Sequence, residues 1–492
     1  MIGNTNLTLV NYNDTRGNNF AMKYVDVDGD SNTINSSWAE LKFPIENGSN
    51  HECSEILFAG LYWVGRADNG PDLNLDFDNN PNTFNINGKT LNKQKVKIKG
   101  PLTATYTELE AAPTDIYFPS NAYQNIFTAY VDITQYVIDN NGEGRYYIAD
   151  MALREGQIDD TGYSGGWGMV VVYENSKMKY RNVTVFDGHA FVDDGVNQDY
   201  SFDVDGFNAV QSGDVNIRLG LMASEGELDF GGDYFEIEEL NSGNYRPLAN
   251  KRGSITNFFD STINYGGVPG SRDPELVNNT GLDIVTYNIP NSDKSIIGNG
   301  QTSTSFNYGT TNDTFVIFNV TFSVDAYIPD VDGILTTTST SATPPLAPNE
   351  SANYTIEIRN KGTEATNNTI ITIPIPDNVN QSDLEITSNV YAPLSITNTP
   401  IYNQNLGPNG SIVWDLGTLP LPSNPDTVLA DISFKLTVTT DCSILSNQSF
   451  DPNISLLGTI VGTGAISNID FETPLIQGYE TSNWDSMYWW FA

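Results

Sequence analysis

The stretch Gly165–Val192, GGWGMVVVYENSKMKYRNVTVFDGHAFV, is the most strongly patterned segment of the chain. Two apolar runs, Met169–Tyr173 and Val183–Phe186, flank a polar turn around Glu174–Lys177. Such an arrangement is typical of a β-hairpin that is buried in a sheet. The sequence therefore predicts that this stretch forms the central hairpin of the N-terminal region.

Other apolar segments have the length and the β-branched or aromatic composition of strands. They are Ile56–Val64, Tyr200–Phe207, Asn216–Met222, Asp233–Ile237 and Phe315–Val324. The best helical candidate, Ala129–Val137, is short, and its pattern fits a strand and a turn equally well. Regularly spaced short strands without long helices indicate sandwiches or jelly rolls. We therefore expect an all-β fold, with a tandem jelly-roll or β-sandwich head followed by an immunoglobulin-like β-sandwich.

A domain boundary is expected near Asp330, before the linker-like segment Thr336–Pro345. Beyond it, Ala352–Gly362 and Thr369–Pro376 alternate as strands do. The expected organisation is an N-terminal β-sandwich at 1–195, a second β-rich half of the head at 196–330, an immunoglobulin-like domain at 331–470, and a C-terminal tail or truncation edge at 471–492.

The composition restricts the class of function. The 61 acidic residues outnumber the 23 lysines and arginines, which gives a formal net charge of -38. Such a charge repels nucleic acid and anionic lipid and attracts cations, so no nucleic-acid partner is expected. No stretch is long enough to span a membrane as a helix, so membrane insertion is not expected either. In Lys93–Lys99 lysine alternates with other residues, which predicts solvent-facing lysines on a strand, here an edge strand protected by charge.

Two cysteines, Cys53 and Cys442, are too few for a disulfide scaffold or a zinc site. They lie in different expected domains, so two separate thiols are favoured, although a bridge between them stays open. The N-terminus, Met1–Val10, lacks the basic start and apolar run of a secretory signal. We therefore expect that an export signal was removed or that the chain is a fragment.

Acidic loops are the candidate metal sites. Asp26, Asp28 and Asp30 alternate along the chain, and in a curled loop their carboxylates could converge on one calcium ion. A solvated turn rich in Asp and Asn explains the same residues, since the spacing is not that of an EF-hand. Asp76 and Asp78, with Asp72 and Asn80, form a second candidate. Asp203 and Asp205, before Gly206, form a third.

Catalysis is not expected. A histidine base could come only from His51 or His189, and a turn at Gly188 would separate His189 from Asp187. No nucleophile-elbow serine lies near either histidine, and the many carboxylates do not single out a glycosidase pair. Trp63 and Trp167 could stack on sugar rings, but aromatic residues in glycine-flanked apolar runs pack in cores more often.

Two parts of the sequence resemble bacterial surface proteins. The segments Asn353–Ala365, Ile373–Val379 and Trp414–Leu419 resemble the immunoglobulin-like "conserved repeat" domain of large bacterial surface proteins. The N-terminal part looks like the head region that precedes such repeats in Bacteroidetes surface proteins of the flavobacterial type; the matching pieces are Asp26–Asp30, Ala59–Trp63, Gly165–Trp167 and Arg181–Gly188. This resemblance implies export by the type IX route and a role in adhesion or gliding.

Together these observations favour an extracellular protein of the outer cell surface that works by binding or adhesion. The expected partner is an extracellular polysaccharide, a surface protein of another cell or further copies of the chain. A structural stalk or filament subunit is one alternative, and a hydrolase acting on extracellular polysaccharide is another.

Overall fold

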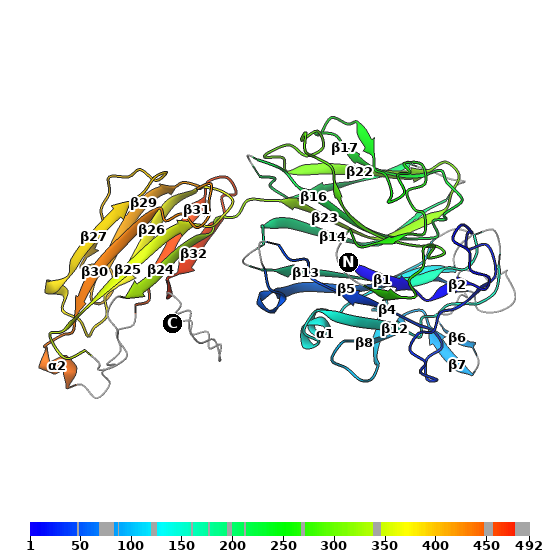
Figure 1. The fold of residues 1–492 in the computed structure, drawn as a ribbon, viewed down its shortest axis with the longest axis horizontal. Helices are drawn as coiled ribbons and strands as arrows, with labels where there is room; N and C mark the ends of the chain where they lie inside the picture. Colours follow the sequence, from blue (N-terminus) through cyan, green and yellow to red (C-terminus); the bar gives the residue numbers. More distant parts are fainter. Residues whose placement is uncertain are drawn as a thin grey trace. The chain divides into compact units, whose positions relative to one another are not determined.

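The computed structural model describes residues 1–46, 49–67, 83–86, 88–119, 125–158, 161–175, 178–193, 199–210, 213–266, 271–337, 346–446 and 456–477. The chain forms two compact units, Met1–Asp325 and Ala326–Ala492. Nearly all of the regular secondary structure in both is β-strand, which confirms the predicted all-β fold of sandwich-like sheets (Figure 1). Within the described ranges, no helix has the length and apolar character to cross a membrane.

The described helices are short. The segment Ala129–Val137 is divided between the end of strand β11 (Ile126–Asp132) and helix α1 (Thr134–Asp139). Helix α2 (Cys442–Leu445) begins after Asp441, whose side chain accepts a hydrogen bond from the Ser443 amide. Neither helix extends to two full turns, in keeping with a fold whose backbone hydrogen bonds run between strands.

The first two sheets of the Met1–Asp325 unit face each other across one core. One has the order β1 (Ile2–Thr5), β13 (Gly165–Glu174), β5 (Glu55–Arg66), β11 (Ile126–Asp132), β10 (Ile116–Tyr117). The other has the order β20 (Arg272–Asp273), β4 (Ser36–Leu41), β12 (Gly144–Ala149), β8 (Lys95–Lys99), β9 (Thr107–Glu110). Two small hairpins complete this half: β2 (Leu7–Leu9) with β3 (Met22–Tyr24), and β6 (Thr83–Ile86) with β7 (Lys89–Asn92).

Two further sheets form the second sandwich of the same unit. The inner sheet has the order β14 (Arg181–Val192), β23 (Phe315–Asp325), β16 (Ile217–Ser224), β21 (Leu282–Ile289), β19 (Ile263–Asn264). The outer sheet has the order β15 (Asp199–Asp205), β22 (Ser303–Thr310), β17 (Asp233–Glu238), β18 (Tyr245–Pro247). In Figure 1 the four sheets lie in layers, from β17 and β22 at the top to β4, β12 and β8 at the bottom.

The stretch Gly165–Val192 does not form the predicted hairpin. Strand β13 pairs with β1 and β5, whereas β14 pairs with β23 in a different sheet. Alternation and apolar runs specify which residues are buried, and they leave the partner strand unspecified. The segment between the two strands therefore connects one sandwich to the other.

The two sandwiches meet through a contact lined by glycine, which we call the glycine contact. A Cβ added at Gly166 would lie 2.5 Å from Leu282 Cδ2, and one added at Gly168 would lie 2.4 Å from Met222 Sδ. A Cβ added at Gly3 would lie 2.3 Å from Ile284 Cδ1. The backbones of β1 and β13 thus lie so close to side chains of β16 and β21 that a Cβ at any of these glycines would displace the ends of those side chains.

The sheets do not divide the chain at residue 195, where we expected a boundary between the two halves of the head. Strand β14, which precedes it, belongs to the second sandwich, and β20, which follows it, pairs with β4 in the first. The Met1–Asp325 unit also ends close to the boundary that the sequence indicated near Asp330.

The Ala326–Ala492 unit is a sandwich of two five-stranded sheets around Trp414, which is fully buried. The first has the order β27 (Glu385–Val390), β30 (Ala430–Thr437), β25 (Ser351–Asn360), β24 (Val331–Thr337), β33 (Ile476–Gln477). The second has the order β28 (Ile401–Asn403), β29 (Ser411–Leu419), β26 (Thr366–Pro374), β31 (Thr459–Gly464), β32 (Asp470–Pro474). Most of residues 470–477 were expected in a tail, but β32 and β33 pair as strands. Strand β32 extends the edge of the second sheet by pairing with β31, and β33 pairs with β24 in the first sheet.

Buried aromatic residues fill the first core as expected. Trp63 and Trp167 are both fully buried, and their indole N–H groups donate to Lys93 O and Ser37 Oγ, each at 2.8 Å. The prediction for the lysines of Lys93–Lys99 is wrong at two points. Lys93 is buried, with Nζ 5.6 Å from the centre of the Phe118 ring, and β8 lies between β12 and β9 rather than at an edge.

The glycine contact leads to a prediction about stability. Replacing Gly166 with alanine places a methyl group 2.6 Å from the backbone oxygen of Asn4 in the adjacent strand, so strands must move apart. We expect Gly166→Ala to lower the free energy of unfolding by about 1–3 kcal/mol, the usual cost of overpacking. Thermal or urea unfolding followed by circular dichroism measures the change.

Gly298→Ala is the matched control, because its added methyl group meets side-chain ends alone, Leu240 Cδ2 at 3.2 Å and Gln301 Oε1 at 3.9 Å. Equal losses of stability in both variants would contradict the role assigned to the glycine contact.

Candidate functional site

The Asp26 loop, residues 24–36, is closed by hydrogen bonds between its own side chains and backbone. Asp26 Oδ1 accepts from Ser36 Oγ at 2.8 Å, and Asp28 Oδ1 accepts from the Asp30 amide at 2.8 Å. The Tyr106 hydroxyl reaches in from outside the loop and donates to Asp28 Oδ2. The loop therefore has an ordered structure that its own residues and Tyr106 maintain.

Two of the three predicted ligands come together. Asp26 and Asp28 influence each other directly, and burial, followed by the charge of Asp28, raises the pKa of Asp26. Burial opposes ionisation of Asp28 as well, but hydrogen bonds led by that of Tyr106 outweigh it and lower the pKa of Asp28. Asp30 instead accepts from the Asn32 side chain at 2.8 Å. No three His, Cys, Asp or Glu side chains are arranged to hold a metal ion anywhere in the part of the chain that the structure describes.

The other predicted acidic loops are not joined to this one. Asp76 and Asp78, with Asp72 and Asn80, lie outside the described residues. Asp203 and Asp205 are exposed residues at the end of strand β15, where they pair with Ser305 and Ser303 of β22. They lie in the outer sheet of the second sandwich, whereas the Asp26 loop adjoins the first.

His189 lies in a strand where we expected a turn. Strand β14 continues through Gly188, with an irregularity in its pairing between Asp187 and Ala190. His189 Nδ1 is 2.9 Å from Thr128 Oγ1, and burial lowers the pKa of His189 to about 4. A neutral imidazole that is hydrogen-bonded to a hydroxyl group contributes to the contact between the sheets. It lacks the carboxylate partner that orients the histidine of a catalytic triad.

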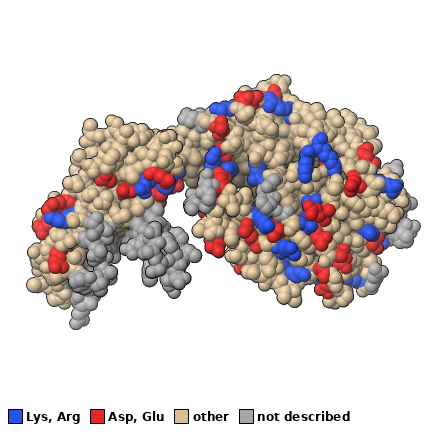
Figure 2. All heavy atoms as spheres, viewed as in Figure 1, with Lys and Arg blue, Asp and Glu red and all other residues tan. Residues whose placement is uncertain are grey.

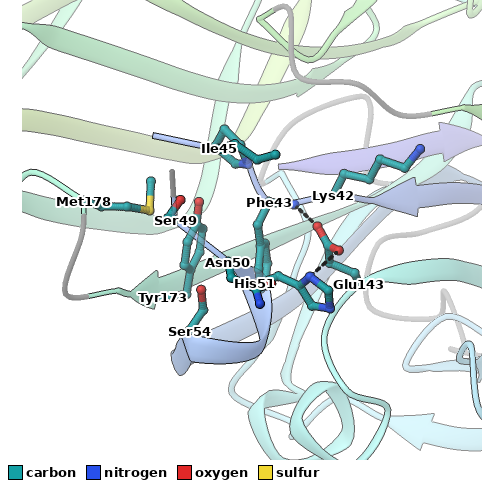
Figure 3. Close-up of a pocket in the computed structure, with 11 residues that line it drawn as sticks. Lys42, Phe43, Ile45, Ser49, Asn50, His51, Ser54, Glu143, Tyr173 and Met178 are labelled. Atoms are coloured by element: carbon teal, nitrogen blue, oxygen red, sulfur yellow. Dashed lines mark hydrogen bonds and ion pairs between the residues drawn. The ribbon is translucent and has the colours of Figure 1, made fainter. Parts of the chain in front are cut away.

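A pocket of about 380 Å³ opens where the chain leaves β4 (Figure 3). Its apolar wall is the stacked pair of Phe43 and Tyr173, whose ring centres are 4.1 Å apart at an interplanar angle of 14°. Polar side chains and further apolar ones line the remainder: Lys42, Pro44, Ile45, Ser49, Asn50, His51, Ser54, Glu143 and Met178. An aromatic wall with a few polar groups is the usual composition of a small-molecule site.

The polar groups of the pocket are held in place by the neighbouring loops. Glu143 accepts a hydrogen bond from the Phe43 amide, and its Oε2 is 3.5 Å from His51 Nδ1. The buried Asn175 side chain donates to Asn50 O at 2.9 Å and to Ser54 Oγ at 3.0 Å. Burial raises the pKa of Tyr173 to about 12, so its hydroxyl group stays protonated and able to donate at neutral pH.

The histidine and the hydroxyl groups of the pocket lie on different sides of an aromatic ring. In Figure 3, His51 and Glu143 lie on one side of Phe43, and Ser49, Ser54 and Met178 lie on the other. The hydroxyl group of Ser54 accepts from Asn175, and that of Ser49 accepts from the Glu46 amide at 3.1 Å. A serine nucleophile needs a base within hydrogen-bond reach, and this arrangement separates the two.

Sequence reasoning missed a group of buried carboxylates in the second sandwich. Asp233 Oδ1 accepts from the amides of Phe258 and Phe259, and Asp283 Oδ1 accepts from those of Asp260 and Thr262, at 3.1 and 2.8 Å for the latter pair. Both aspartates are fully buried. Burial raises the pKa of Asp233 to about 7, although its backbone hydrogen bonds act in the opposite direction. Burial, followed by the charge of Asp260, raises the pKa of Asp283 well above its usual range. The two aspartates thus fix the segment 258–262 against the sheet.

Comparisons with known proteins do not assign a family. No protein-family model matches the chain, and no curated protein matches its sequence. Dimeric latent PorU from Porphyromonas gingivalis is 10% identical, with a TM-score of 0.18, and the match covers 82% of this chain and 33% of PorU. A membrane-anchored protein from Corynebacterium diphtheriae is 8% identical, with a TM-score of 0.16, over 98% of this chain and 92% of that one. The chain thus spans about a third of the length of PorU, and similarity at these TM-scores carries no argument about function.

Because Asp233 is buried, we expect the free energy of unfolding of the protein to depend on pH. Its pKa is about 7 in the folded state and 3.8 when unperturbed, so the folded state binds the proton more tightly. The stabilising contribution is therefore present at low pH and is lost as the pH rises through 7. Asp233→Asn should remove the part of this dependence that Asp233 contributes, which amounts to about 2–3 kcal/mol between pH 5 and pH 8, and leave the part that Asp283 contributes.

Urea unfolding of both proteins at several pH values across this range measures the difference. The exposed Asp214, changed to asparagine, serves as control. If wild type and Asp233→Asn lose stability in parallel as the pH rises, Asp233 is not the titrating group.

Proposed function

We propose that this chain is an extracellular binding protein of the outer cell surface and that its pocket beside Phe43 and Tyr173 binds a saccharide residue of a polysaccharide or of another surface. The observation that carries the proposal is the aromatic wall within a small open pocket. The apolar faces of sugar rings pack against aromatic rings, while their hydroxyl groups need nearby donors and acceptors.

The polar lining supplies these donors and acceptors. The amide of Asn50, the hydroxyl group of Ser54 and the ammonium group of Lys42 line the same pocket. A volume of about 380 Å³ lies near the lower end of the range for ligand sites, which suits one or two sugar rings. The location at the cell surface rests on the resemblance to Bacteroidetes surface proteins and on the acidic composition, which suits a secreted protein.

A polysaccharide hydrolase is the second candidate, because His51 and Glu143 form the one pair of titratable groups that contact each other among the described lining residues. Glycoside hydrolysis canonically uses two carboxylates, and Glu143 is the one carboxylate among the described residues that line the pocket, which favours binding over hydrolysis. Release of reducing sugar from a bound polysaccharide, abolished in Glu143→Gln, would favour the hydrolase instead.

Removing one ring of the aromatic wall should weaken binding. An array of printed mono- and oligosaccharides identifies a ligand for the wild-type chain, and calorimetry then compares variants. We expect Tyr173→Ala to bind about tenfold more weakly, the effect of losing roughly 1–1.5 kcal/mol of ring contact. Tyr173→Phe retains the ring and should stay closer to wild type.

Tyr308→Ala is the matched control, because it removes one ring of another stacked pair, Tyr200 and Tyr308, in the outer sheet of the second sandwich. Unchanged affinity in Tyr173→Ala, or no binding to any saccharide on the array, would reject the proposed role of the pocket.

Calcium bound by the Asp26 loop is part of the proposal. Asp26 and Asp28 supply two neighbouring carboxyl groups, and calcium would complete its coordination with backbone oxygens and water. Calcium at ten times its dissociation constant should raise the stability of the folded protein by about 1.4 kcal/mol over that in chelator. Thermal unfolding with calcium and with chelator measures this difference in wild type, in Asp26→Asn/Asp28→Asn and in the control Asp203→Asn/Asp205→Asn.

The double variant of the Asp26 loop should lose the calcium response, and the β15 control should keep it. An identical unfolding midpoint with calcium and with chelator would remove the Asp26 loop from consideration as a metal site.

A further inference from the structure

A row of aromatic and cationic side chains crosses the outer face of the sheet that contains β4, β12 and β8. In the pairing register, Trp38 of β4 lies opposite Tyr147 of β12, and Tyr147 lies opposite Lys99 of β8. The ring centres of Trp38 and Tyr147 are 6.2 Å apart, and Lys99 Nζ is 4.4 Å from the centre of the Tyr147 ring. Residues directly opposite each other in a sheet share a face, so these three form a line across the strands.

Two further side chains extend this line, which we call the Trp38 row. Lys99 Nζ is also 4.7 Å from the centre of the Tyr106 ring, and the Arg145 guanidinium carbon is 4.3 Å from the centre of the Trp38 ring. Arg145 is exposed, and the other members of the row are partly exposed. Strands lie about 4.8 Å apart, so the row covers roughly 10–15 Å of surface.

Both cations of the row lack a carboxylate partner among the described residues. Glu40 lies opposite Arg145 in the register, but its carboxylate bonds to Ser271 Oγ and to Lys42 Nζ, at 2.9 and 3.2 Å. The neighbouring Lys97 forms an ion pair with Asp150, in which Nζ and Oδ2 are 2.9 Å apart. Lys99 and Arg145 are thus held over aromatic rings with no ion-pair partner in the part of the chain that the structure describes, although the chain has 61 acidic residues.

We propose that the Trp38 row binds an acidic polysaccharide. Sugar rings of such a polymer pack on Trp38, Tyr147 and Tyr106, and its carboxylate groups pair with Lys99 and Arg145. The row thus presents rings and cations within the same short line, as an acidic polymer presents sugar rings and anionic groups. The inference builds on the proposed saccharide binding, but it uses a different surface from the Phe43 pocket.

The net charge of the chain does not prevent this association. Interactions between exposed charges are largely screened beyond about 8 Å at physiological ionic strength, so the local arrangement decides. Figure 2 shows acidic and basic side chains interspersed over the viewed face of the Met1–Asp325 unit.

Binding of the full chain to polygalacturonate, immobilised for interferometry, tests the proposal, with dextran as the neutral polymer. We expect binding to polygalacturonate and not to dextran, and about tenfold weaker binding in Lys99→Gln/Arg145→Gln. The matched control is Lys23→Gln/Lys251→Gln, which removes the same charge from exposed positions elsewhere in the Met1–Asp325 unit. Circular dichroism confirms the fold of each variant, and the single variants replace any double variant that does not fold.

Several results would overturn the proposal. They are equal weakening in the row variant and the control, equal binding of dextran and polygalacturonate, and binding of poly-glutamate as tight as that of polygalacturonate. Tyr173→Ala separates the two surfaces. If it loses array binding but keeps polygalacturonate binding, both assignments hold, and if neither ligand binds wild type, both fail. If the wild type binds the array but not polygalacturonate, the proposal for the Trp38 row is rejected and the proposal for the Phe43 pocket is unaffected.

Discussion

The close approach of backbone and side chain at the glycine contact is the constraint on which the Met1–Asp325 unit depends. Because Gly3, Gly166 and Gly168 have no side chains, β1 and β13 leave room for the side chains of β16 and β21. The sheet that contains β13 is therefore covered on both faces, by the second sandwich on one side and by its partner sheet on the other. This double burial explains why β13 has buried residues at six successive positions, and why the outer sheets are left to carry the exposed side chains.

Local patterns in the sequence predicted where strands occur, but they did not predict which strands pair when these lie far apart in the chain. Apolar runs identified β5, β16, β23 and the two strands of Gly165–Val192, because burial in a sheet imposes its own composition. The hairpin was wrong because β14 pairs with β23, more than a hundred residues later, and nothing within Gly165–Val192 specifies that partner. Strand β20 was missed for a similar reason, since a two-residue strand has no periodicity to detect.

The same distinction applies to the sites. The Asp26 loop could be found because its acidic residues lie within a few positions, and the structure brings Asp26 and Asp28 together while Asp30 turns to Asn32. The Phe43 pocket joins residues 43, 143 and 173, whose proximity depends on the order of strands. For the Trp38 row, the alternation of lysines in β8 indicated which face meets solvent, but the register alone places Tyr147 between Trp38 and Lys99. The buried Asp233 and Asp283 carry no local signal, since most aspartates of such a chain are exposed.

The pairing of β20 with β4 has a consequence for the order in which the protein can fold during synthesis. Residues 1–175 contain nearly all of the first sandwich, yet its edge is completed by Arg272–Asp273, and its core includes Met222, Leu282 and Ile284. A ribosome would have released well over half of the chain before those residues became available. Because the packing of the first sandwich depends on these distant residues, we expect the two sandwiches to complete their packing together, and slowly.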